Sequence, residues 1–297
     1  MKRILRLDAP LDLGLTLRPF VRGRGDPTMR LERTEAWRAT RTPFGPAAEH
    51  LRVRCGAVEV EAWGLGAEWL LDRAPALLGM HDDPAGFKPR HPQLREAHRL
   101  HPGLRIGRSD SVVESLVPTI LEQKVTGTGA RRSFRALVRA YGEPAPGPWS
   151  LLLCPEPTLL ASLPYQEFHP LGVERRRAAA IKIACSYATR LEETIGLDSA
   201  TAWRRLLALP GVGPWTAALV AGAAWGDADA VEVGDLHVPH SVCWFLAREP
   251  RGSDARMLQL LERYAGQRGR VIRLIGASGM RAPRYGPRAE VVSYAKI

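Results

Sequence analysis

The stretch Leu209-Pro210-Gly211-Val212-Gly213 lies between two segments of helical periodicity and decides the fold of the second half of the chain. Before it, Ala202, Leu206 and Leu209 recur at the spacing of one helix face. After it, Pro214 to Ala221 form a run typical of a buried helix that opens with proline. Two glycines separated by one residue allow a very tight turn without Cβ clashes. The sequence therefore predicts two helices joined by a glycine turn.

The predicted turn is suited to binding an anion through its backbone. Its N–H groups would converge with the start of the second helix, and oriented amides at a helix N-terminus hold anions without help from side chains. On duplex DNA the natural anion is a backbone phosphate, and such a contact positions the protein without reading base sequence. A glycine-rich connection of purely structural use fits these five residues equally well.

A single carboxylate, Asp235, follows 22 residues after Gly213. Gly234 before it permits an unusual backbone angle. The run Val238 to Ala247 can form a helix, and its N-terminus would stabilise the aspartate as an anion. The ordinary alternative is a helix N-cap, for which aspartate is a preferred residue. The glycine turn at a matching distance upstream favours a catalytic carboxylate.

The segment Leu209 to Thr216, taken with Val233-Gly234-Asp235-Leu236-His237, resembles the helix-hairpin-helix DNA glycosylase superfamily. Asp235-Leu236-His237 matches the Asp-x-His form that many members carry, and the most similar branch is that of DNA-3-methyladenine glycosylase II (AlkA-like). The resemblance also includes Ile120 to Val125 and covers most of residues 30 to 276.

The resemblance implies an α+β N-terminal domain followed by a mainly α helix-hairpin-helix glycosylase domain. We place the first domain at residues 1–100 and the second at 101–280, and we expect residues 281–297 to form a basic, mobile tail. Within the first domain, alternating leucines between positions 11 and 17 predict a half-buried strand. Alternating apolar residues on both sides of Gly56 predict a β-hairpin.

The resemblance also assigns roles to individual residues. Asp235 is the catalytic residue. The residues expected to contact DNA are Leu209, Gly211, Val212, Gly213, Thr216, Gln123 and Lys124. The residues expected to form the base pocket are Trp215, Leu219 and His237.

Gln123 and Lys124 match the loop that fills the hole left when a base is flipped out of the duplex. Lys124 stands where this branch carries an apolar wedge, and a lysine wedges poorly. Gln123 is therefore the predicted filler, with a glutamine that merely ends a helix as the structural alternative.

The chemistry that the resemblance implies is hydrolysis of the N-glycosidic bond of alkylated, cationic purines. The sugar C1′ gains oxocarbenium character as the base departs, and a fixed carboxylate in a dry site stabilises that cation and can orient or deprotonate water. We expect no second catalytic carboxylate, because Glu232 is predicted to be exposed.

Members that also cleave the strand place a Schiff-base lysine two residues after the last glycine of the hairpin. That position is Trp215 here, and tryptophan has no amine. We therefore expect a monofunctional glycosylase that leaves an abasic site. The indole would line the base pocket or pack in the core, and the sequence favours neither. Two other hypotheses stay open: a bifunctional glycosylase/lyase, and a non-catalytic DNA-binding helix-hairpin-helix protein.

The composition agrees with a polyanionic partner. Forty-two Lys and Arg residues against 31 Asp and Glu give a net charge of +11, which favours nucleic acid through counterion release. Arg131, Arg135 and Arg139 recur every fourth residue and form either a phosphate-binding stripe or, slightly favoured, a solvated helix face.

The remaining expectations concern cofactors and location. The spacing of the four cysteines fits neither a zinc site nor an iron–sulfur cluster, so we expect no cofactor beyond a monovalent cation among the hairpin carbonyls. No apolar run is long enough to span a membrane and no signal peptide is evident. We expect a monomeric, cytoplasmic, nucleoid-associated protein whose partner is double-stranded DNA that contains damaged bases.

Overall fold

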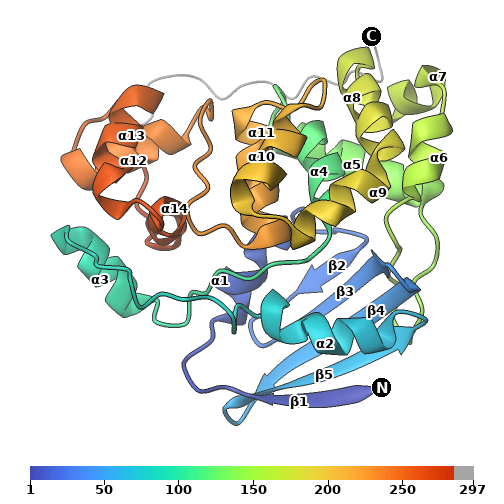
Figure 1. Cartoon of the computed structure of the whole chain (residues 1–297), viewed down its shortest axis with the longest axis horizontal. Coiled ribbons are helices and arrows are strands. Elements are labelled where there is room, and N and C mark those ends of the chain that lie inside the picture. Colours follow the sequence, from blue (N-terminus) through green and yellow to red (C-terminus); the bar gives the residue numbers. More distant parts are fainter. Residues whose placement is uncertain (284–297) are drawn as a thin grey trace.

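The computed structural model describes residues 1–283, which form an antiparallel sheet in the N-terminal region and a larger helical region above it (Figure 1). The sheet has the order β1-β5-β4-β3-β2. Its strands are β1 (Lys2–Arg6), β2 (Met29–Leu31), β3 (Glu35–Thr42), β4 (Gly45–Arg54) and β5 (Ala57–Gly64). The predicted β-hairpin is confirmed as β4 and β5, which turn at Cys55 and Gly56.

Alternation along β5 gives the sheet one apolar face. Val58, Val60 and Ala62 are fully buried, while the residues between them are partly exposed. Helix α2 (Ala67–Leu77) covers this face and buries Leu70 and Ala74 against it (Figure 1). This sheet-and-helix pair forms an apolar core of its own, to which α1 also contributes.

The predicted strand over residues 11–17 is wrong. The segment forms helix α1 (Leu13–Leu17), which continues into the short 3-10 helix η1 (Arg18–Phe20). The Asp12 carboxylate caps α1 by accepting the Leu15 N–H at 2.8 Å. Leucines at every second position also include a pair four residues apart, and Leu13 and Leu17 are buried on the same helix face. The leucine spacing fits both a strand and a helix, and the Asp12 cap favours the helix.

The helical region begins with α3 and ends with α14. Its elements are α3 (Pro92–Leu100), α4 (Val112–Leu121), α5 (Gly127–Tyr141), α6 (Pro157–Ser162), α7 (Tyr165–Phe168), η2 (His169–Leu171), α8 (Arg175–Ser186), α9 (Ala188–Glu192), η3 (Glu193–Gly196), α10 (Ser199–Leu207), α11 (Pro214–Val220), the π-helical turn η4 (Ala221–Trp225), α12 (Val238–Ala247), α13 (Asp254–Leu261), η5 (Glu262–Tyr264) and α14 (Arg268–Ala277). None of the helices within residues 1–283 combines the length and the apolar character needed to cross a bilayer.

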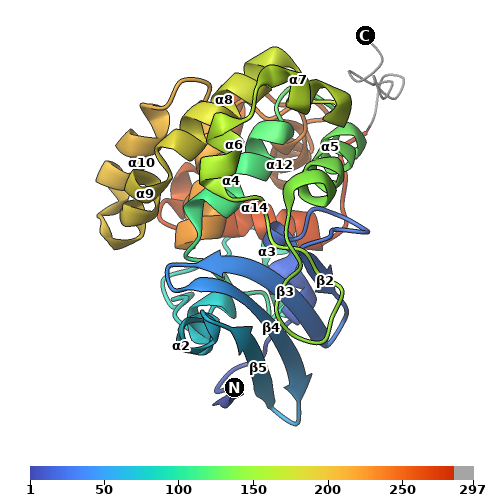
Figure 2. The same ribbon diagram turned by 90° about the vertical axis from the view of Figure 1, so that its right-hand side faces the viewer.

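The helices gather around two separate apolar cores (Figure 1). The first core joins α4 to α11, with Leu116, Ile181 and Val220 among its fully buried residues. The second joins α12, α13 and α14 to α3, around Phe245 and Leu274. Figure 2 shows the sheet below the helices, with α5 on the same side of the molecule as β2. The predicted domain limits stay a prediction, and residues 284–297 of the expected basic tail lie outside the described residues.

The helical hairpin predicted from the glycine stretch is confirmed as α10 and α11. Asp198 caps α10 through the Thr201 N–H, and Pro214 occupies the first turn of α11. Gly211 turns the chain with a φ of +87°, and a Cβ at this position would lie 2.8 Å from the Cβ of Ala180. A residue without a side chain is required here for two reasons, the backbone angle and the close approach of α8.

Candidate active site

A cleft of about 2100 Å³ runs between the two helical cores. Its walls come from chain segments that lie far apart in the sequence. They include Glu122–Gly129, Gly211–Gly213, Gly234–Val238 and Gly279–Pro283. The cleft therefore brings together the loop after α4, the hairpin turn and the segment before α12, which are three of the places that the sequence analysis singled out.

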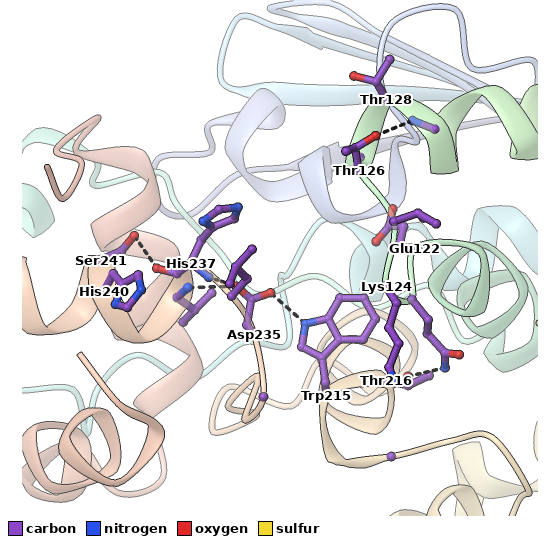
Figure 3. A pocket seen from close by; sticks show the side chains of 18 of the residues that line it. Glu122, Lys124, Thr126, Thr128, Trp215, Thr216, Asp235, His237, His240 and Ser241 are labelled. Carbon is purple, nitrogen blue, oxygen red and sulfur yellow. Dashed lines mark hydrogen bonds between the residues drawn. The ribbon is translucent and has the colours of Figure 1, made fainter. Parts of the chain in front are cut away.

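Asp235 lies on the wall of this cleft, and its carboxylate is oriented from two sides (Figure 3). Oδ1 accepts the N–H groups of His237 at 2.7 Å and Val238 at 2.9 Å, at the start of α12. Oδ2 accepts the Trp215 Nε1–H at 2.8 Å from α11. Three N–H donors match a carboxylate, which only accepts hydrogen bonds. One oxygen of Asp235 thus accepts N–H groups at the start of α12, and the other accepts the indole N–H. A helix-capping role and a catalytic role are therefore compatible for this residue.

The turn before Asp235 is held by its own hydrogen bonds. Gly234 has a φ of +92°, and its N–H donates to both carboxylate oxygens of Asp254 at 3.1 Å. The Asp235 N–H donates to the Glu232 carbonyl at 3.1 Å. A left-handed glycine in this turn is the reason that the chain can enter α12 with the aspartate beside the cleft.

Trp215 is half-buried on the first turn of α11 and lines the cleft. Figure 3 shows its indole pointing toward Asp235. The side chain therefore forms part of the cleft wall and also positions the carboxylate. The structure brings Trp215, His237 and Asp235 to the same cleft, and their roles in the base pocket and in catalysis stay predictions.

Leu219 and Leu209 lie elsewhere. Leu219 is on α11 one turn beyond Trp215 and is not among the residues that line the cleft, because the cleft covers only the start of this helix. Leu209 is buried in the first helical core, just before the turn. Leu209 was expected to contact DNA and Leu219 to form the base pocket, and neither residue lines the cleft.

The hairpin turn itself faces the cleft through Gly211, Val212 and Gly213. A Cβ added to Gly213 would meet no atom within 4 Å, so the backbone there is open to a ligand. The Leu209 carbonyl accepts the Val212 N–H at 3.0 Å, which tightens the turn. The monovalent cation expected among the hairpin carbonyls stays a prediction.

Gln123 ties the loop after α4 to the hairpin. Its Nε2 donates to the Gly211 carbonyl and to Thr216 Oγ1, both at 2.9 Å. With both amide hydrogens occupied, the side chain is held on the hairpin at the wall of the cleft. Lys124 follows with a φ of +54°, is exposed and also lines the cleft. Both residues of the expected duplex-filling loop therefore face the cleft, and the expectation that Gln123 fills the hole stays a prediction.

Glu232 is a second carboxyl group near Asp235, and the prediction that it is exposed is wrong. Its Oε2 atom is buried and has no hydrogen-bond partner among the described residues. Burial raises the pKa of Glu232 to about 7; the negative charge of Asp235 adds to this rise and the positive charge of Arg273 opposes it. Burial also lowers the pKa of Arg273, on α14, to about 10. A charged residue flanked by two valines gave no local sign that the turn folds inward.

Within residues 1–283 no three His, Cys, Asp or Glu side chains are grouped in a way that would bind a metal ion. The four cysteines are unpaired; Cys185 and Cys243 are buried and Cys55 is exposed.

No family model matches the sequence. The chain is 32% identical over 219 residues to the probable bifunctional transcriptional activator/DNA repair enzyme AlkA of Mycobacterium tuberculosis. The match covers 69% of this chain and 43% of that protein, so the chain spans less than half the length of its curated relative.

Solved structures share the fold. A 3-methyladenine DNA-glycosylase from Archaeoglobus fulgidus matches with a TM-score of 0.78 at 20% identity, covering 92% of this chain and 97% of the other. An 8-oxoguanine glycosylase/lyase from Clostridium acetobutylicum, bound to double-stranded DNA, matches with a TM-score of 0.64 at 15% identity, covering 85% and 97%.

We predict that Glu232→Gln makes the protein more stable at pH 8 and changes little at pH 4. The carboxyl has an ordinary pKa of 4.5 and a folded pKa of about 7. The stabilisation from its bound proton is therefore complete below pH 4.5 and lost as the pH rises through 7. Glutamine does not titrate, so the variant should gain roughly 2 to 3 kcal/mol at pH 8 in urea unfolding.

The control for this experiment is Glu68→Gln, an exposed residue on α2. Glu192, whose pKa burial also raises to about 7, is present in every protein compared and cancels from the difference. The same pH dependence of unfolding in wild type and Glu232→Gln would contradict the burial argument.

Proposed function

Because the chain belongs to the helix-hairpin-helix DNA glycosylase superfamily, we propose that it hydrolyses the N-glycosidic bond of alkylated bases in duplex DNA. The observation that carries this proposal is the Asp235 carboxylate, held by Trp215 and the start of α12 on the wall of a cleft beside the glycine turn. The curated relative is named as a DNA repair enzyme.

The hairpin turn would hold the DNA backbone. Gly211 and Gly213 present main chain to the cleft, and the open space around Gly213 at the start of α11 suits a phosphate. Gln123 joins this turn to the loop that ends in Lys124. The phosphate-binding turn and the loop that would enter the duplex therefore keep a constant spacing. We assign the filling of the hole to the Lys124 side chain and not to Gln123.

Asp235 would act mainly as a fixed negative charge. As the bond from C1′ to the base breaks, the base leaves with the electron pair and the sugar becomes oxocarbenium-like. A preorganised carboxylate stabilises that charge without reorganising during the reaction. Its three N–H donors hold both carboxylate oxygens in a fixed orientation before the substrate binds. This fixed geometry favours electrostatic stabilisation as the main role of Asp235.

Trp215 would favour cationic purines. The face of an indole ring attracts positive charge, and an alkylated purine carries that charge before it leaves. Trp215 lies at the cleft wall next to Asp235, so one residue would both contact the base and orient the carboxylate. The substrate would thus combine a positively charged base with a sugar that becomes positive.

We predict that Asp235→Asn slows single-turnover base release from methylated duplex by at least about 100-fold, because the stabilising charge is lost. The new amide nitrogen would also face the Trp215 N–H, donor against donor. Asp8→Asn, an exposed aspartate of the N-terminal region, serves as the control and should match wild type. Equal release by the Asp235 variant would remove the catalytic assignment; no release by wild type would leave a DNA-binding protein without this activity.

We predict different losses for two substitutions of Trp215. Trp215→Phe keeps an aromatic wall but removes the hydrogen bond to Asp235, so release should slow roughly tenfold on every substrate. Trp215→Leu also removes the ring face, so release of cationic 7-methylguanine should fall roughly threefold to tenfold more than release of neutral hypoxanthine. Trp244→Phe on α12 is the matched control. An unchanged ratio between the two bases in Trp215→Leu would argue against contact between the ring and the base.

The hypothesis of a bifunctional glycosylase/lyase has one specific observation in its favour. Lys124 is exposed and lines the same cleft as Asp235, so an amine is present although the usual position holds Trp215. We expect no covalent adduct when wild type is treated with borohydride during base release, since Lys124 would fill the duplex. An adduct that disappears in Lys124→Gln would identify a lyase that uses this lysine.

A further inference from the structure

The loop of residues 21–28, between η1 and β2, is held together by its own hydrogen bonds. Asp26 is buried, and its carboxylate accepts the Arg22 N–H at 2.6 Å and the Thr28 N–H at 2.8 Å. The Asp26 N–H in turn donates to the Gly23 carbonyl at 3.3 Å. Because one side chain joins both ends of the loop, its exposed residues are held in place before any partner binds.

This loop packs on α5 of the helical region. Gly23 and Gly25 have φ angles of +83° and +80°, and a Cβ at Gly23 would lie only 2.2 Å from the Cδ atom of Arg131. Arg135 Nη1 donates to the Arg24 carbonyl at 2.9 Å. The arginine repeat on α5, which the sequence suggested as a phosphate stripe or a solvated face, therefore serves in part to hold this loop.

The loop continues the rim of the cleft. Arg22 forms an ion pair with Glu122 at 3.7 Å, and Glu122 lines the cleft, as do Gly129 and Arg132 at the start of α5. Arg24, Arg131 and Arg132 are exposed, and we call these three residues the basic rim. The nearby acidic groups are engaged, Glu122 by Arg22 and Asp26 by hydrogen bonds inside the loop. The rim thus presents a surplus of positive charge at the edge of the cleft that Glu122 and Arg132 form.

We propose that the basic rim binds phosphates of the duplex beyond the segment held in the cleft, so that the N-terminal region takes part in DNA binding. Guanidinium groups form forked hydrogen bonds with phosphate oxygens. Because the loop and the helix are already ordered, their backbone loses little freedom when the arginines bind. The inference rests on the proposed function for the location of the damaged base, but it concerns affinity and not the chemical step.

The test measures affinity for a duplex with a central tetrahydrofuran abasic-site analogue over a series of salt concentrations. Arg24→Gln/Arg131→Gln should reduce the slope of log K against log salt by about 2, one for each lost phosphate contact. The matched control is Arg33→Gln/Arg54→Gln, which removes the same charge. Both control residues are exposed at the other end of the sheet, beside the paired Glu35 and Arg52. This control should keep the wild-type slope within about 0.5, because it loses no phosphate contact.

Arg24→Gln alone provides a second variant, because its side chain is exposed and the packing of Arg131 on Gly23 is preserved; its slope should fall by about 1. Circular dichroism melting confirms that each variant is folded. Slopes equal to those of the Arg33/Arg54 control would overturn the inference even if wild type releases bases. If wild type binds the duplex with the expected slopes but releases no base, the basic rim stands and the proposed function fails.

Discussion

The hydrogen bond between Trp215 and Asp235 connects the two halves of the helical region. Trp215 belongs to α11, whose buried face is part of the first apolar core, and Asp235 precedes α12, which belongs to the second. The 2.8 Å bond therefore joins two separately packed units at the wall of the cleft. Any shift of one core relative to the other would move the carboxylate away from its donor, so the geometry of the site depends on this single contact and on the interactions that keep the cores in register.

Those interactions converge on the π-helical turn η4 at the end of α11. Its carbonyls are free to accept bonds from outside the helix. Gly222 accepts from Arg273 of α14 at 2.8 Å, and Ala223 accepts the Ser109 N–H at 2.9 Å. Ala224 accepts the Asp110 N–H at 3.1 Å. The last carbonyls of a helix have no partner within it. Here these groups attach both the second core and the segment before α4 to the hairpin helix.

How far the sequence predicted this structure depends on how local each signal was. The hairpin was predictable because two glycines and a proline determine a turn and a helix start within a few residues. The α1 segment was not, because its leucines satisfy two periodicities and Asp12 decides between them. The surroundings of Glu232 and Gln123 were not predictable for a different reason. Their environments come from α14 and from the hairpin turn, which meet them only in the folded chain.

The indole N–H on Asp235 also determines what a substitution at position 215 would do to the carboxylate. Tryptophan donates as a neutral group, so it orients the carboxylate without placing a positive charge beside it. A lysine would place an ammonium group there and form an ion pair that offsets the charge of the carboxylate. A neutral donor at this position therefore leaves the electrostatic field of the carboxylate directed into the cleft.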